Sequence, residues 1–131
     1  MRIFKYKWFS KFVQKENIED GELLDIIDKL EAGQADADLG SGVFKMRMAR
    51  PGGGKSGSFR VIVFFRSEDK AFFQYAYPKA ARDNISEKEL RFFKKLAKKY
   101  LAMTESQLTE ALNAEDFFEI VEDKRGEEVR E

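Results

Sequence analysis

A forty-residue block in the middle of the chain, residues 43–82, alternates apolar side chains with Lys and Arg and is interrupted by one glycine-rich loop. Within residues 43–49 the apolar side chains fall on one face of an extended strand, and two cations, Lys45 and Arg47, fall on the other. This period of two predicts a half-buried strand with one basic face.

Two further strands are predicted in the same block. Residues 59–66 are β-branched and aromatic almost throughout, which suits a central strand that is covered on both faces. A polar break at residues 67–70 then leads into the apolar run 71–77, in the manner of an antiparallel hairpin. We therefore expect the strands at 43–49, 59–66 and 71–77 to be adjacent and antiparallel.

The N-terminal part of the chain shows a helical pattern. Residues 2–7 begin with alternating apolar side chains and predict a short first strand, and the apolar spacing of residues 8–15 is that of one helix face. A second helix is expected to begin at one of two candidate N-caps, Asn17 or Asp20, and to end at Gly33. These two helices would form a hairpin on one face of the sheet.

The remaining segments complete the predicted fold. Residues 34–42 are small and polar and are interpreted as a connecting loop. Capping boxes that start at Ser86 and Thr104 predict two C-terminal helices, residues 117–121 suggest a small strand, and the acidic tail 122–131 has the composition of a disordered end. The expected class is α+β: a small twisted antiparallel sheet with an N-terminal helix pair on one face and C-terminal helices.

Composition excludes several kinds of chemistry. The 131 residues contain no cysteine and no histidine, so a thiolate metal site is impossible and the commonest general base is missing. Any catalysis would use Lys, Arg, Tyr or carboxylates, and neither a metal nor a cofactor is expected. The length suits a single core, and the sequence shows no signal peptide or membrane-spanning run. A reducing cytoplasm is the expected location.

The formal net charge of zero conceals an uneven distribution. Residues 43–100 carry fifteen basic and five acidic side chains, whereas residues 1–42 carry six and nine, and residues 101–131 carry three and ten. A segment this basic predicts a phosphate-rich partner if its charges share one face. The alternative, that Lys and Arg only solvate the surface, suits the lysine-rich helix after Ser86 better than the strand cations.

The glycine loop at residues 50–58 allows three interpretations. Gly54-Lys55-Ser56 looks like the end of a Walker A phosphate loop, but that motif must open a helix, and this loop leads into a predicted strand. The loop could instead be a plain hairpin connection. The third interpretation is a mobile basic loop in which Arg50 and Lys55 close over a phosphodiester.

These residues together resemble a known family. Lys45-x-Arg47, the loop and strand entry at 50–60, Tyr77-Pro-Lys79 and the capped helix at Ser86 are similar to the RelE/ParE toxin superfamily, and most of all to its HigB-like branch of bacterial type II toxins. The similarity implies a toxin domain over residues 1–101, a helix-and-strand extension of that domain over 102–121, and the tail beyond.

The resemblance also implies a function. The RelE-like toxins are endoribonucleases (mRNA interferases) that cut mRNA on the ribosome, and a cognate antitoxin, for HigB-type toxins a helix-turn-helix protein of the HigA-like kind, neutralises them. ParE-like relatives inhibit DNA gyrase instead. A gyrase-inhibiting toxin, or a nucleic-acid-binding module without catalytic activity, therefore stays open as an alternative. No membrane partner is expected.

Residue by residue, the resemblance implies four catalytic positions, and four further residues are candidates for binding RNA or its phosphates, with Tyr75 as an alternative to Tyr77 for stacking on a base. The catalytic positions are Lys45, Arg47, Arg60 and Lys79. The binding positions are Arg50, Lys55, Tyr77 and Arg82. Two positions differ from classical RelE, because Ala80 stands where arginine is frequent and the C-terminal tyrosine has no clear counterpart near Ile85.

Such a set can cut RNA without histidine. The 2′-hydroxyl attacks the adjacent phosphate, and the reaction needs a base, an acid and stabilisation of the charge on the phosphorane. Lys45 is assigned as the base, Arg47 and Arg60 as phosphate clamps, and either Lys79 or Lys55 as the acid. We expect the cations of this set to converge on one concave surface.

Overall fold

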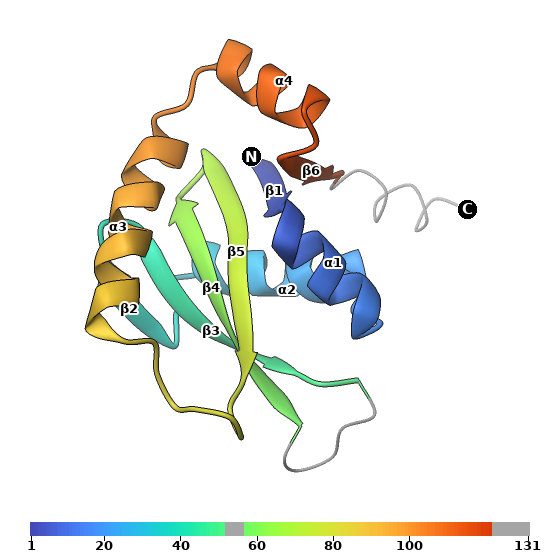
Figure 1. Cartoon of the computed structure of the whole chain (residues 1–131), viewed down its shortest axis with the longest axis vertical. Helices are drawn as coiled ribbons and strands as arrows, with labels where there is room; N and C mark the ends of the chain where they lie inside the picture. The colour runs from blue at the N-terminus through green and yellow to red at the C-terminus, as the bar shows by residue number, and fades with distance from the viewer. Residues whose placement is uncertain (52–56, 122–131) are drawn as a thin grey trace.

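The computed structural model describes residues 1–51 and 57–121. Within them the chain forms six strands and four helices (Figure 1). The strands are β1 Arg2–Tyr6, β2 Ala37–Gly40, β3 Val43–Ala49, β4 Ser58–Arg66, β5 Lys70–Pro78 and β6 Phe117–Ile120. The helices are α1 Lys7–Lys15, α2 Asp20–Glu31, α3 Glu87–Leu101 and α4 Glu105–Asn113. The predictions for Lys55 and for the acidic tail lie outside the described residues.

The strands form one six-stranded sheet in the order β2-β3-β4-β5-β1-β6. As predicted, β3, β4 and β5 are adjacent and antiparallel, with β4 in the middle. β1 runs parallel to β5 and lies between it and β6, with which it is antiparallel. The N-terminal strand β1 therefore lies inside the sheet and joins β5 to the C-terminal strand β6.

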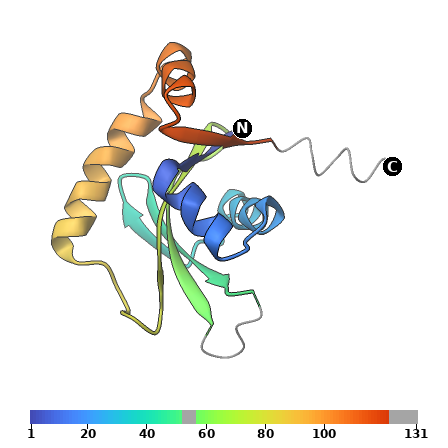
Figure 2. The same cartoon turned by 45° about the vertical axis from the view of Figure 1, so that its right-hand side comes forward.

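Helices cover both faces of the sheet (Figure 2). The pair α1 and α2 packs on one face around Phe9, Leu23 and Ile27, which meet Val61 and Phe73 of the sheet. On the opposite face α3 and α4 pack over a second apolar cluster. The predicted N-terminal helix pair on one face is confirmed, and so is the α+β class. None of the helices that the structure describes is long and apolar enough to cross a membrane.

Two local predictions were wrong. The segment 34–42 is not only a loop, because β2 within it pairs with β3; Ala, Asp and Gly have low strand propensity, so the sequence concealed it. The N-cap of α2 is Glu19 rather than Asn17 or Asp20. Asn17 instead adopts a left-handed conformation, with φ +58°, and its N–H donates to the Gln14 carbonyl at the end of α1.

A bulge interrupts β5. Ile62 lies opposite Tyr75, whereas the next residue, Val63, lies opposite Phe73, so Gln74 is an extra residue in β5. Because of it, Phe73 belongs to the α1–α2 face while Tyr75 packs against the α3 face. The second half of β5 therefore presents its tyrosines to the face that carries the strand cations.

Candidate functional site

Three side chains form a row across the sheet on the face that carries α3. Arg47 of β3 lies opposite Arg60 of β4, and Arg60 lies opposite Tyr77 of β5. Directly opposed residues point to the same face, so the two arginines are neighbours although thirteen positions separate them in the sequence. This pairing is the part of the predicted cation cluster that the register alone establishes.

Lys45 belongs to the next row on the same face, with Ile62 and Tyr75. Its Nζ donates a hydrogen bond of 2.7 Å to Oδ1 of Asn84, in the segment that connects β5 to α3. That segment leaves the end of β5 and returns to the start of α3 (Figure 1). It therefore borders the strand cations on one side.

The charges in these two rows are poorly compensated. Within the part of the chain that the structure describes, neither Lys45 nor Arg60 has a carboxylate within 4.0 Å, and Arg60 donates only a long bond, 3.4 Å, to Ser58 Oγ. Nε of Arg47 is 3.6 Å from Oδ1 of Asp36, but its side chain is 70% exposed. Such a surface attracts an anion.

Arg82, in contrast, is bound within the protein. Its Nη1 and Nη2 donate to the two oxygens of Glu89 at 2.9 Å each. Glu89 is also the N3 residue of the α3 capping box and accepts the Ser86 N–H at 2.8 Å. These bonds, first of all those from Arg82, lower the pKa of Glu89 to about 2. Arg82 thereby fastens the segment after β5 to the start of α3.

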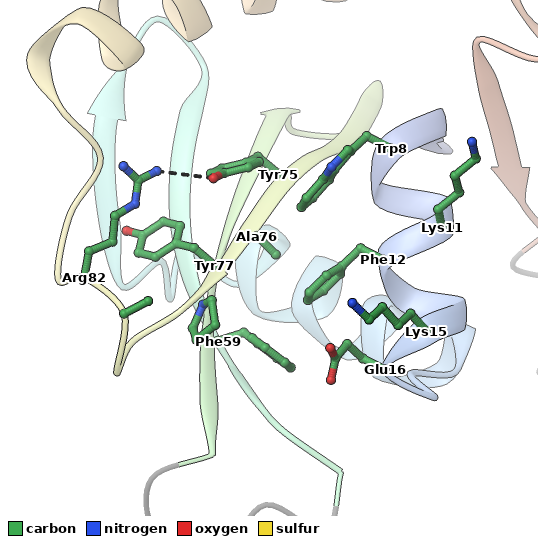
Figure 3. A pocket seen from close by; sticks show the side chains of 12 residues that line it. Trp8, Lys11, Phe12, Lys15, Glu16, Phe59, Tyr75, Ala76, Tyr77 and Arg82 are labelled. Carbon is green, nitrogen blue, oxygen red and sulfur yellow. Dashed lines mark hydrogen bonds between the residues drawn. The ribbon is translucent and has the colours of Figure 1, made fainter.

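Tyr77 lies beneath this pair. Its ring faces the Arg82 guanidinium at 4.9 Å (Figure 3), and its hydroxyl donates to the Asp83 carbonyl at 3.4 Å. The side chain is buried, and burial raises the pKa of its hydroxyl above the ordinary value. Tyr77 is therefore placed to support Arg82.

The other predicted site residues are not members of these two rows. Arg50 lies over the ring of Phe59, on the α1–α2 face, with its Nε 3.7 Å from Oε1 of Glu16. Lys79 follows β5 and is exposed, and its N–H donates to the Ser58 carbonyl. Lys55 cannot be placed because it is outside the described residues. The structure therefore brings Lys45, Arg47 and Arg60 to one face and does not bring Arg50 to it.

Sequence reasoning missed three partners at this site: Asp36, Asn84 and Glu89. Glu89 was recognisable as part of a capping box, but nothing in the sequence indicated that it also binds Arg82. Asp36 and Asn84 lie in segments without a pattern, and only the path of the chain brings them to the strand cations. In residues 1–51 and 57–121 no cluster of three or more acidic side chains is arranged to hold a metal ion.

The fold and the site define a class: small α+β proteins with a basic sheet face. A family model described as the RelE toxin of the RelE/RelB toxin–antitoxin system matches residues 1–120. The chain therefore belongs to the RelE toxin family, as the sequence predicted. Whether it falls in the HigB-like branch stays a prediction. Searches among curated proteins and among solved structures gave no match.

Proposed function

We propose that this chain is the toxin of a type II toxin–antitoxin pair and that it acts as an endoribonuclease on mRNA bound to the ribosome. One observation supports this most strongly: Arg47 and Arg60 lie side by side on an open sheet face, with Lys45 one row away, and neither Arg60 nor Lys45 has a carboxylate partner in the described structure. Paired guanidinium groups are suited to a phosphodiester.

In this proposal the RNA phosphate lies over the row of Arg47 and Arg60. The two guanidinium groups bind the non-bridging oxygens and stabilise the charge that develops on the phosphorane. Lys45 takes the proton of the attacking 2′-hydroxyl, and an exposed cation at the end of β5, Lys79, gives a proton to the leaving 5′-oxygen. The products are a 2′,3′-cyclic phosphate and a free 5′-hydroxyl.

Asn84 has a positioning role in this mechanism. Its amide oxygen accepts from Lys45 at 2.7 Å and carries no net charge, so it fixes the lysine without repelling an approaching phosphate. The ribosome would present the mRNA in a geometry suited to in-line attack, which lowers the demand on a site without histidine. A cognate antitoxin, of the helix-turn-helix kind, would neutralise the toxin.

Expression of the chain without an antitoxin tests the proposal. The intact protein should arrest growth and leave mRNAs with new 5′-hydroxyl ends, and Arg60→Ala should relieve both effects. Lys98→Ala, on the exposed face of α3, is the matched loss of one cation and should change neither. Growth arrest with intact mRNA and inhibited gyrase would contradict the nuclease assignment and favour a ParE-like activity.

A further inference from the structure

A groove opens beside the basic face, on the outer side of β5. Its volume is about 560 Å³, and it runs between α1 and the segment that follows β5 (Figure 3). Trp8 and Phe12 of α1 form one wall, Tyr77 and Arg82 form the other, and Ala76 lies on the floor. Tyr77 also ends the Arg47–Arg60 row, so groove and basic face meet at one residue.

The α1 wall is an exposed aromatic surface held in place by its neighbours. Trp8 is 42% exposed, although its ring is stacked on Phe12 at 5.6 Å and 8° and contacts Tyr75 at 5.0 Å. Because the neighbouring rings already fix the position of Trp8, its side chain loses little conformational entropy when a ligand binds. Flat aromatic surfaces of this kind stack with unpaired nucleobases.

The rim of the groove is positively charged. Lys11 and Lys15 line it, and in the described structure neither has a carboxylate within 4.0 Å. The one acidic residue among the lining side chains, Glu16, has its Oε1 3.7 Å from Nε of Arg50. The rim of the groove therefore favours an anionic ligand over a cationic one.

The floor offers a donor and an acceptor of the main chain. The Lys79 N–H donates to the Ser58 carbonyl, which makes Arg60 and Tyr77 a hydrogen-bonded pair and the next pair, Val61 and Ala76, a non-hydrogen-bonded one. The N–H and C=O of Ala76 consequently point away from β4, toward the groove. A donor beside an acceptor matches the hydrogen-bonding edge of a base.

The same edge is poorly suited to an added peptide strand. Pairing between β1 and β5 stops at Phe73. Pro78 has no N–H, and its carbonyl already accepts from the N–H groups of Ala81 and Arg82. Between Ala76 and Pro78 only Ala76 offers both groups on this edge, whereas strand addition relies on a series of main-chain bonds.

We propose that this groove binds one unpaired nucleobase of the RNA strand, next to the phosphodiester held by Arg47 and Arg60; the proposal rests on the proposed function above. The base stacks on the Trp8 wall and meets the main chain of Ala76, and its phosphate lies by Lys11 or Lys15. The protein would thereby select single-stranded RNA, since a base within a duplex cannot enter.

A labelled 2′-O-methyl RNA tetranucleotide, which cannot be cut, tests this by direct binding. We expect Trp8→Ala to weaken its binding about tenfold, in line with loss of one base–aromatic stack. With a fully abasic version of the oligonucleotide the same substitution should change nothing. Phe92→Ala, which removes a 57% exposed ring from α3, is the matched control, and thermal unfolding confirms that each variant is folded.

The design separates the two proposals. Arg60→Ala should weaken binding of the base-bearing and the abasic oligonucleotide to the same extent, because it removes a phosphate contact. Equal binding of the base-bearing oligonucleotide by the intact protein and by Trp8→Ala would overturn the base site, while a loss with Arg60→Ala would leave the phosphate site supported. Fluorescence of Trp8, the only tryptophan in the chain, is expected to be quenched by the oligonucleotide. If the cognate antitoxin changed the fluorescence of Trp8 and the oligonucleotide did not, the base site would be overturned and the groove would be identified as a protein-docking site.

Discussion

Two arginines lie on either side of Tyr77 and differ in what surrounds them. Arg82 lies over the ring and gives two hydrogen bonds of 2.9 Å to Glu89. Arg60 lies opposite Tyr77 across the strand pair, and in the described structure its side chain donates only the long bond to Ser58. One guanidinium has its hydrogen bonds within the fold, and the other has no carboxylate partner in the described structure. Two cations that the family pattern treats alike therefore differ in their partners, and this difference is the basis of the predictions below.

The largest expected effect is on catalysis at Arg60. Loss of one clamp on a developing phosphorane costs on the order of 3 kcal/mol, so Arg60→Ala should reduce single-turnover cleavage of ribosome-bound mRNA about a hundredfold. The melting temperature should stay the same, because no carboxylate in the described structure depends on Arg60. A variant that lost stability instead would show that Arg60 is a structural residue like Arg82.

Arg82→Ala should affect stability more than the phosphate contact. It removes two charge-assisted hydrogen bonds to a carboxylate that also caps α3, and since both side chains are about one-third exposed, we expect a loss of about 1–2 kcal/mol. Chemical denaturation measures it. Arg91→Ala, on the exposed side of α3, is the matched control, and an equal loss there would remove the contrast between the two arginines.

Acid should weaken the same contact. The pKa of Glu89 is lowered from 4.5 to about 2 in the folded protein, so the pair stabilises the fold above pH 4.5 and this contribution disappears as the pH falls through about 2. Because both side chains are partly exposed to solvent, the contribution of this ion pair to the free energy of unfolding is about 1 kcal/mol. The difference in stability between the intact protein and Glu89→Gln should therefore shrink between pH 5 and pH 2. Glu87→Gln, in the same first turn of α3, is the matched control.

The smallest effect should come from Asn84. Asn84→Ala removes the neutral acceptor at Lys45 Nζ and should reduce cleavage a few-fold, as expected for a residue that positions another. Asn84→Asp would place a carboxylate there and should impair binding of the 2′-O-methyl oligonucleotide through repulsion of the phosphate. If both variants bound and cleaved like the intact protein, Lys45 would need no positioning.

The sequence predicted the structure well where the alternation of apolar and polar residues matches the two-residue period of a regular strand. Lys45 and Arg47 could be placed on one face because residues 43–49 alternate without interruption. Whether Arg60 joins them depends on the register between β3 and β4, which a single sequence does not specify. A period of two through 71–77 would put Phe73 and Tyr75 on one face, and the bulge at Gln74 places them on opposite faces.

The contacts of the connecting segments were beyond the reach of sequence reasoning. Asn84 meets Lys45 across 39 positions, and the pairing of Arg82 with Glu89 depends on how residues 79–86 turn. Arg50 was expected in the site as part of a basic loop that closes over a phosphodiester, yet it lies over Phe59 on the other face. Alternate residues of an extended chain point to opposite faces, and Arg50 comes three positions after Arg47.

The position of β1 between β5 and β6 has a consequence for how the chain is made. Ile3 pairs with Ala71 on one side and with Ile120 on the other, so β1 is synthesised before either of its partners and cannot complete its pairing until both have been made. The β3–β4–β5 meander consists of local hairpins and can form earlier. During synthesis, the surface with Lys45, Arg47 and Arg60 can therefore assemble before β1 and β6 join the sheet. For that period the basic face exists while the domain is still incomplete.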